Sequence, residues 1–443
     1  MVWRKVSDNR WEHLANTFDA YFIFTEKLSA DLCGGREHYV LFSTLKLEIS
    51  IPNVESALRY AWKQIRYEQP QLAATVEGMA KVYEVPDEKG LEQWLASTFI
   101  VSQASDAEEL YRSVTPIKQA TLYYLPNSSE LAFRAHHHSI DGTGVFLFWH
   151  SYLSAVANPL KQIKFGDEPA RLNPSVEEAL GYPEEPTQAH SEEAAALLGS
   201  YAEGLPGIGP VSKLGEAPVG NCHNTELVFS AETTEALVKA CKDKGITMTA
   251  AIHAAYIITL TRHADPKSKL GEYVTTSQFN LRPYLPDPYN SSKYAVAVYY
   301  TPIPYKVGLP NSYWDVAKSL QDYYQSTFKG NAVPLELVGP LARLSFNFTQ
   351  TPEYLSIPMS KDALVSSLGI VERYVQREYG SGIKVKDIKM GIDIIMGMSF
   401  FFAYTFRDQL RLVYSFNDGY EEAKNIQTYM EEVQSILIEE LLA

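Results

Sequence analysis

Residues 134–144 read Arg-Ala-His-His-His-Ser-Ile-Asp-Gly-Thr-Gly. A β-prone run precedes this stretch, and apolar residues at helical spacing follow it, so it is expected to join a strand to a helix. Gly142 and Gly144 are expected to let the backbone turn tightly there. A strand end leaves side chains exposed at a sheet edge, and imidazole titrates near neutrality. His137 is therefore a candidate general base.

The histidine stretch allows three interpretations. The first is a catalytic base, with Asp141 either holding the turn or steadying His137 by its charge. The second is a metal site, since His and Asp ligate zinc or iron. This reading lacks a clear third ligand, so no metal is expected. The third is a buried, hydrogen-bonded structural histidine, which is the usual case for a lone His; His138 is expected to face the core.

The regions around this stretch mix helices with antiparallel strands. Residues 53–66 predict a helix that Asn53 can cap, and residues 120–125 and 131–135 predict a hairpin leading into the histidines. A Pro-rich connection is expected over about 165–222, with a short helix at 192–202. Later elements are expected as helices at 230–245, 247–260, 314–328 and the last 20 residues, strands at 273–281 and 294–304, and a hairpin at 399–416.

Length and composition indicate a two-domain globular protein. The chain has 443 residues, 46% of them hydrophobic and 21% charged. This suggests two domains of roughly 200 residues each. We place an N-terminal half at 1–175, a connection at 176–225 and a C-terminal half at 226–443.

Charge and cysteine content exclude some partners and compartments. The net charge of −14 disfavours nucleic acid and anionic membranes as partners. Three scattered cysteines indicate a reducing compartment. The first residues lack the apolar run of a signal peptide, and no run approaches the length of a membrane span. A cytoplasmic protein is the expectation.

Four motifs together resemble a known superfamily. His136-His137-x-x-x-Asp141-Gly142 resembles the signature shared by chloramphenicol acetyltransferase, peptide-synthetase condensation domains, carnitine acyltransferases and plant BAHD acyltransferases. Residues 279–283 resemble its Asn-x-Arg-Pro element, residues 366–369 a later Ser/Asn-x-Gly stretch, and residues 401–417 its closing hairpin. The chain looks most similar to fungal secondary-metabolite O-acyltransferases such as the trichothecene O-acetyltransferases. The plant-type Asp-Phe-Gly-Trp-Gly motif is absent.

The resemblance implies a fold and a route for the substrates. It implies an α/β fold with mixed sheets, in which two chloramphenicol-acetyltransferase-like domains form a V around a central channel. Acyl donor and acceptor would enter from opposite mouths and meet at His137. One chain would contain both halves of the channel, so a monomer would suffice. No bound cofactor is implied, because acyl-CoA would be a co-substrate.

The resemblance also implies roles for further residues. Asp141 would point away from the channel and pair with Arg282 of the Asn-x-Arg-Pro element, orienting the loop of the base. His136, Gly142 and Asn280 would support the motif. Candidates for the oxyanion donor are Ser366 and Ser367, which otherwise would only cap or turn the backbone. The adjacent Cys222 and His223 are interpreted as incidental.

The leading hypothesis is an acyltransferase that moves an acyl group, most simply acetyl, from acyl-CoA to a hydroxyl of a small secondary metabolite. His137 would act as base without an acyl-enzyme. One alternative in the same fold uses an acyl thioester on a carrier protein. Another is a protein of this fold that catalyses a rearrangement such as a cyclisation, or only binds a metabolite.

Overall fold

The computed structural model describes residues 3–15, 18–182, 185–268, 271–309 and 311–443. The chain forms two compact units. Unit 1 comprises Met1–Glu184, Asn280–Tyr300 and Val371–Ile392, and unit 2 comprises Glu185–Phe279, Thr301–Ile370 and Asp393–Ala443. Each unit combines a β-sheet with packed helices, which confirms the expected mixed α/β class.

These units differ from the contiguous halves expected at 1–175 and 226–443. Two segments from late in the chain, 280–300 and 371–392, belong to unit 1. The second carries a strand that pairs with an early strand of the chain, from Ile392↔Leu41 to Ile383↔Ile49. The sequence patterns predicted neither of these two strands nor their pairing.

A six-stranded sheet in the order β13-β14-β3-β8-β7-β6 forms the centre of unit 1. All neighbours are antiparallel except β6 and β7. Its strands are β3 (Leu41–Ile49), β6 (Phe99–Val101), β7 (Thr121–Leu125), β8 (Glu130–Ala135), β13 (Glu378–Tyr379) and β14 (Ile383–Ile392).

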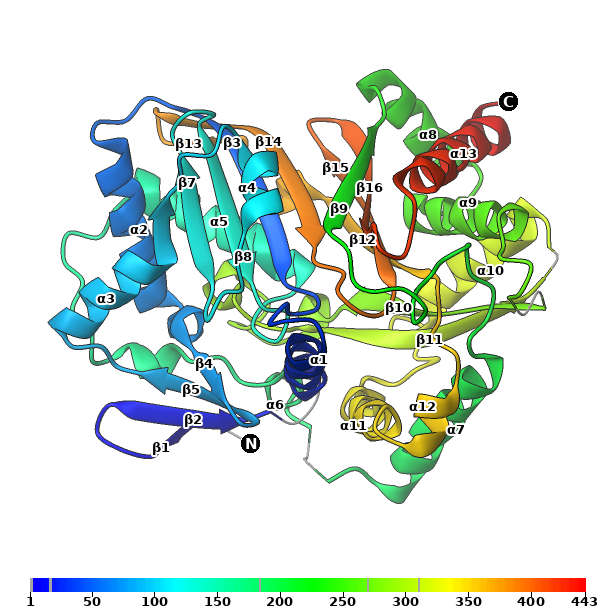
Figure 1. The fold of residues 1–443 in the computed structure, drawn as a ribbon, viewed down its shortest axis with the longest axis horizontal. Coiled ribbons are helices and arrows are strands. Elements are labelled where there is room, and N and C mark those ends of the chain that lie inside the picture. The colour runs from blue at the N-terminus through cyan, green and yellow to red at the C-terminus, as the bar shows by residue number, and fades with distance from the viewer. Residues whose placement is uncertain (1–2, 16–17, 183–184, 269–270, 310) are drawn as a thin grey trace. The chain divides into compact units, whose positions relative to one another are not determined.

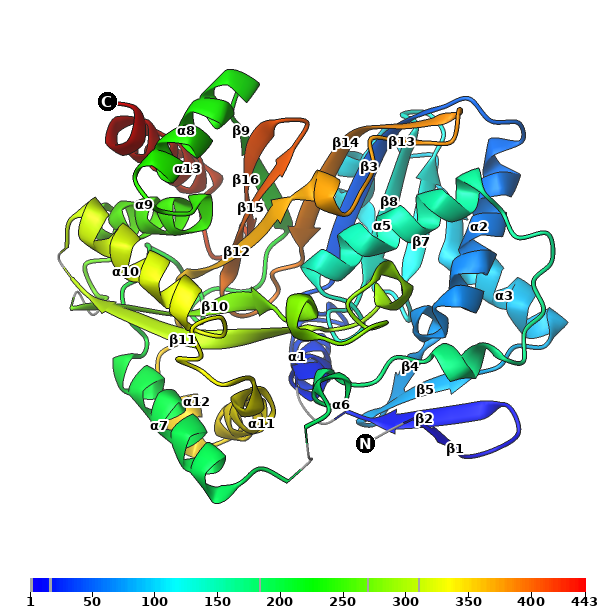
Figure 2. The same ribbon diagram turned by 180° about the vertical axis from the view of Figure 1, so that it is seen from behind.

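Helices cover both faces of this sheet, as Figure 1 and Figure 2 show. On β8, Phe133 stacks on Phe148 of α5, whereas the adjacent Ala132 packs in the cluster that includes Leu110 of α4. Adjacent residues of a strand face opposite sides, so both sides of β8 are buried. The helices of unit 1 are α1 (Phe18–Leu32), α2 (Val54–Glu68), α3 (Glu88–Thr98), α4 (Ala107–Ser113), α5 (Gly142–Ala157) and α6 (Val176–Leu180).

A smaller antiparallel sheet in the order β1-β2-β5-β4 completes unit 1. Its strands are β1 (Arg4–Lys5), β2 (Arg10–Leu14), β4 (Thr75–Glu77) and β5 (Ala80–Glu84). Short 3-10 helices lie at η1 (Pro70–Ala73), η2 (Glu168–Arg171), η3 (Arg282–Tyr284), η4 (Ser292–Tyr294) and η6 (Val371–Arg373).

Unit 2 contains a four-stranded sheet in the order β12-β15-β16-β9. Helices α8, α9, α10 and α13 pack against one face of it and form one hydrophobic core with it (Figure 2). The strands are β9 (Cys222–Val228), β12 (Ala363–Ile370), β15 (Ser399–Phe406) and β16 (Gln409–Asn417). The helices are α8 (Ala231–Asp243), α9 (Met248–Arg262), α10 (Tyr313–Ser326) and α13 (Ala423–Leu442).

The remaining elements lie almost entirely in unit 2. Strands β10 (Glu272–Asn280) and β11 (Tyr300–Gly308) form a two-stranded sheet. The other helices are α7 (Gln188–Gly204), η5 (Leu335–Leu337), α11 (Val338–Phe348) and α12 (Pro352–Ser356). In the part of the chain that the structure describes, no helix is both long and apolar enough to cross a bilayer.

Most expected elements are present, and four expectations are corrected. The predicted hairpins are β7–β8 and β15–β16. The strand expected at 294–304 begins only at Tyr300, the helix expected at 192–202 extends over α7, and the connection ends where β9 begins at Cys222. Asn53 precedes α2 but makes no side-chain capping bond. Burial and pairing outside the local pattern set these boundaries.

Candidate active site

The histidine stretch forms a buried turn between β8 and α5, as the sequence predicts. The amide and the hydroxyl of Ser139 both donate to the carbonyl of His136, at 3.1 Å and 2.7 Å. This closes a tight turn directly after the strand. The ring of His137 lies in the middle of that turn and is only 5% exposed.

Asp141 caps α5 and binds a distant segment of unit 1. Its Oδ1 accepts from the amide of Gly144 at 2.7 Å, and its Oδ2 accepts from the amide of Tyr299 at 2.7 Å. Nη1 of Arg282 donates to both oxygens at 2.8 Å. The carboxylate therefore accepts four hydrogen bonds, which suits a residue that orients a loop better than one that carries protons.

The Arg282 side of this pair is also fixed. Asn280 Oδ1 accepts from the amide of Arg282 at 3.1 Å, and Nη2 of Arg282 donates to the carbonyl of Ala297 at 3.3 Å. The amide of Asp141 donates to the same carbonyl at 3.2 Å. The ion pair expected between the two motifs is thus present, and Asn280 supports it.

Gly144 is required for close approach rather than for a tight turn. A Cβ at this position would lie 2.4 Å from the carbonyl oxygen of Ala295 and 3.1 Å from Nη2 of Arg282. Neither Gly142, the first residue of α5, nor Gly144 has a positive φ. Both glycines therefore have ordinary backbone geometry at the start of α5, and the tight turn lies just before them, at residues 136–139.

The ring of His137 is clamped by aromatic side chains. Phe22 of α1 stacks on it at 4.2 Å between centroids, with 10° between the planes. Tyr300 lies at 5.6 Å, tilted by 48°. Nδ1 is buried without a hydrogen-bond partner among the described residues. Nε2 is the nitrogen left to meet a substrate.

Burial keeps His137 in its neutral, basic form. It lowers the pKa of His137, and this outweighs an interaction with its own backbone and the charges of Asp141 and Glu26, which raise it. A neutral imidazole is the form that accepts a proton. The site is thus electrostatically prepared for general-base chemistry.

The two flanking histidines each bind a carboxylate. Nε2 of His136 lies 2.9 Å from Glu37 Oε2, and Nδ1 of His138 lies 2.8 Å from Glu26 Oε2. Burial lowers the pKa of His136, but the charge of Glu26 and the bond to Glu37 outweigh it and raise that pKa overall. Burial also lowers the pKa of His138. His138 lies in the core as expected.

Sequence patterns did not identify four residues of this site: Phe22, Glu26, Glu37 and Tyr300. Phe22 and Glu26 are four residues apart in a helix, and a Glu at the spacing of that helix's apolar positions is a signal that could have pointed to Glu26. Tyr300 lies in the strand expected at 294–304, but nothing in that pattern indicates a contact with His137, and no expected element contains Glu37.

The two serines proposed as oxyanion donors differ in their surroundings. Both lie on β12 of unit 2, where adjacent residues face opposite sides. The hydroxyl of Ser367 is engaged with Thr249 of α9 at 2.7 Å. The hydroxyl of Ser366 makes no hydrogen bond with a described residue, and its neighbour Val365 faces the helix-packed core.

Cys222 and His223 do not form a catalytic pair. They are adjacent on β9, so their side chains face opposite sides of the strand. Cys222 Sγ contacts the carbonyl of Ile394 at 3.3 Å, and His223 Nε2 binds Asp418 Oδ2 at 2.9 Å. Among the described residues, no group of three or more His, Cys, Asp or Glu side chains is arranged to hold a metal ion.

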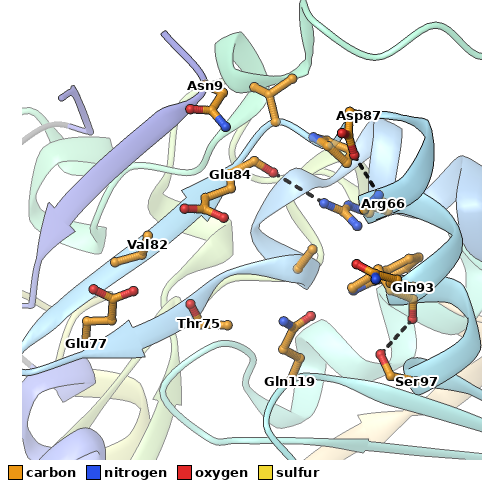
Figure 3. Close-up of a pocket in the computed structure, with 15 residues that line it drawn as sticks. Asn9, Arg66, Thr75, Glu77, Val82, Glu84, Asp87, Gln93, Ser97 and Gln119 are labelled. Atoms are coloured by element: carbon orange, nitrogen blue, oxygen red, sulfur yellow. Dashed lines mark hydrogen bonds between the residues drawn. The ribbon is translucent and has the colours of Figure 1, made fainter. Parts of the chain in front are cut away.

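A separate hollow of about 850 Å³ lies in unit 1 between β4, β5 and α3 (Figure 3). Arg66 lines it, stacked 4.7 Å above the ring of Trp94, and donates weakly to the carbonyl of Glu84 at 3.3 Å. The hollow is lined by neither the histidine stretch nor any other histidine. We therefore place the candidate active site at His137 and not there.

Known proteins with similar sequences include acetyltransferases, and a relative from Epichloe uncinata that is 26% identical over 462 residues is named a transcription factor of a loline biosynthesis cluster. The sequence is 29% identical over 420 residues to the O-acetyltransferase pigM of Monascus ruber, covering 92% of this chain and 81% of that one. No family model matches the chain.

Solved structures of acetyltransferases and condensation domains share the fold. The trichothecene 15-O-acetyltransferase TRI3 from Fusarium sporotrichioides superposes with a TM-score of 0.82 at 17% identity, over 98% of this chain and 97% of that one. The first condensation domain of the calcium-dependent antibiotic synthetase has a TM-score of 0.68 at 14% identity, over 96% and 95%. The chain therefore shares its fold with a trichothecene 15-O-acetyltransferase and with condensation domains, and its sequence is similar to fungal acetyltransferases.

Proposed function

We propose that this protein transfers an acyl group, most simply acetyl, from acyl-CoA to a hydroxyl of a small secondary metabolite, with His137 as the general base. The observation that carries this proposal is the state of His137. Its ring is clamped and neutral, and its Nδ1 is buried, while its Nε2 is not engaged by any described residue. The similarity to O-acetyltransferases supports the acyl group and the kind of acceptor.

The proposed reaction needs no acyl-enzyme. Nε2 of His137 takes the hydroxyl proton while the oxygen attacks the thioester carbon, since a neutral hydroxyl is a poor nucleophile. The C–O bond forms, and the carbonyl oxygen becomes an oxyanion. The C–S bond then breaks, and the leaving thiolate takes the proton from the imidazolium. The products are an ester and free CoA thiol.

The oxyanion needs a donor fixed in advance. We propose Ser366 for this role, because its hydroxyl is not engaged by a described residue, whereas that of Ser367 is bonded to Thr249. Ser366→Ala should lower kcat, and Ser367→Ala is its matched control. Equal effects of the two substitutions would remove Ser366 from this role.

Release of free thiol tests the proposal directly. The protein is mixed with acetyl-CoA and a pool of fungal alcohols, and thiol is measured over time beside the His137→Ala variant. Alcohol-dependent thiol release by the unmodified protein alone is the expected result. No turnover with acyl-CoA, but turnover with the same acyl group on a carrier protein, would establish the carrier-bound alternative. An alcohol converted to an isomer without thiol release would establish a rearrangement.

A further inference from the structure

Helix α1 supports the histidine stretch with one face. Phe22 and Glu26 are four residues apart, so they lie one turn apart on the same side of the helix. Phe22 stacks on the ring of His137, and Glu26 accepts a hydrogen bond from Nδ1 of His138 at 2.8 Å. In both views α1 stands at one end of the unit 1 sheet (Figure 1, Figure 2). One helical turn thus contacts both the base and the residue after it.

The backbone of the stretch is tied to the same helix. Nζ of Lys81 on β5 donates to the carbonyl of His138 at 2.8 Å. The same Nζ lies 3.0 Å from Oδ2 of Asp19, in the first turn of α1. Side chain and main chain of His138 are therefore both fixed relative to α1.

Glu26 is a costly residue to keep in this place. It is 5% exposed, and its Oε1 has no hydrogen-bond partner in the described part of the chain. A buried, half-satisfied carboxylate destabilises a fold unless something compensates it. Burial raises the pKa of Glu26, but the charges of His138 and His136 outweigh burial and lower it overall. Glu26 is therefore ionised at neutral pH.

The charges of Asp141 and Glu26 both raise the pKa of His137, but the two carboxylates have different partners. Asp141 is neutralised by Arg282 at 2.8 Å. The direct partner of Glu26 is Nδ1 of His138 at 2.8 Å, and burial lowers the pKa of that imidazole. When His137 accepts a proton it becomes a buried cation, which a negative charge nearby stabilises.

We propose that Glu26 is a positioning residue of the acyl transfer, holding the turn of His137 through His138 and stabilising the imidazolium that His137 becomes. This inference rests on the proposed function. Other charged or titratable groups face this cluster, and none of them is substituted in the test: Asp19, Glu37, Lys81, Arg134, His136 and Asp141.

The test is Glu26→Gln, which keeps an oxygen to accept from His138 and removes the charge. The control is Glu168→Gln, since Glu168 is also a buried carboxylate of unit 1 and accepts from the hydroxyl of Tyr83 at 2.8 Å. We measure melting temperature, kcat, KM for acetyl-CoA and kcat/KM against pH.

Glu26→Gln should lower kcat about 10-fold or more with KM unchanged, because the lost interaction is made mainly in the transition state. The acid limb of the kcat/KM profile of Glu26→Gln should move to lower pH, because the charge of Glu26 raises the pKa of His137 in the unmodified protein. Glu168→Gln should lower only the melting temperature.

An unchanged kcat and acid limb in folded Glu26→Gln would overturn the inference. If that variant does not fold, Glu26→Asp keeps the charge and withdraws it by one methylene. Glu26→Asp should then lower kcat and leave the acid limb of the kcat/KM profile near its original pH. An acid limb that moves as far as the loss of the charge predicts would overturn the inference. Activity retained by His137→Ala would instead overturn the proposed function, whatever Glu26 shows.

Discussion

Both oxygens of the Asp141 carboxylate accept a hydrogen bond from Nη1 of Arg282, at 2.8 Å each, across 141 positions of the sequence. Both side chains are buried, and the carboxylate also caps the helix that follows the histidines. This pair ties the turn of His137 to the segment 280–300. It is the structural basis of the first prediction.

Asp141→Ala and Arg282→Ala should each lower both melting temperature and activity. Removing one partner strands a buried charge, at a cost of roughly 3–5 kcal/mol. The double variant should be less destabilised than the sum of the two, because both residues share one interaction. A thermal-melt double-mutant cycle measures this coupling. Additive losses would contradict the pairing, and normal stability with lost kcat in Asp141→Ala would indicate a proton relay instead.

His137→Ala should abolish turnover and leave the fold intact. The ring donates no structural hydrogen bond among the described residues, whereas a general base contributes about 10²-fold or more to kcat. Thiol release from acetyl-CoA measures the loss, and circular dichroism checks the fold. A variant that keeps more than about a tenth of the original kcat would defeat the assignment.

The acid limb of kcat/KM should lie below the ordinary imidazole pKa of about 6.5. Protonation removes the base, and burial lowers the pKa of His137, so activity persists to a lower pH than for an exposed histidine. A pH profile from 4.5 to 8 in constant-ionic-strength buffer gives the position of the limb. A limb above the ordinary value would mean that another group titrates.

The histidine stretch and its partner could be predicted, but its supporting residues could not. The residue types at 136–142 made His137 the candidate base, and the resemblance of the motifs at 136–142 and 280–283 to a known superfamily implied the pair of Asp141 and Arg282, which the structure contains. Glu26 and Phe22 carry no motif, and only the packing of α1 brings them to the turn. The discontinuous units likewise depend on β14 pairing with β3, which no local pattern encodes.

Gly144→Ala should destabilise the protein by about 1–3 kcal/mol, because the new Cβ would overpack a buried site. It would lie 2.4 Å from the carbonyl oxygen of Ala295, a main-chain atom that cannot rotate away. Gly199→Ala is the matched control, since this exposed glycine of α7 has no neighbour within 4 Å of a Cβ. It should stabilise by about 0.5–1 kcal/mol. Urea unfolding measures the change in the free energy of unfolding for both variants. Equal changes in Gly144→Ala and Gly199→Ala would contradict the argument that Gly144 is required for close approach.

The stability of unit 2 should contain a contribution that falls as the pH rises through about 7. Burial raises the pKa of Asp362 to about 7, against the bond from Tyr256 at 2.7 Å, which lowers it. The folded protein therefore binds this proton more tightly than the unfolded chain, whose Asp titrates near 3.9. The contribution is complete below the unfolded value and lost above the folded one. Asp362→Asn should remove this pH dependence. On going from pH 4 to pH 8, the free energy of unfolding of the variant should therefore increase by about 1 to 4 kcal/mol relative to that of the unmodified protein. Urea unfolding at both pH values measures this, with Asp322→Asn on the exposed side of α10 as the control. The same pH slope in Asp362→Asn and the unmodified protein would show that Asp362 is ionised throughout.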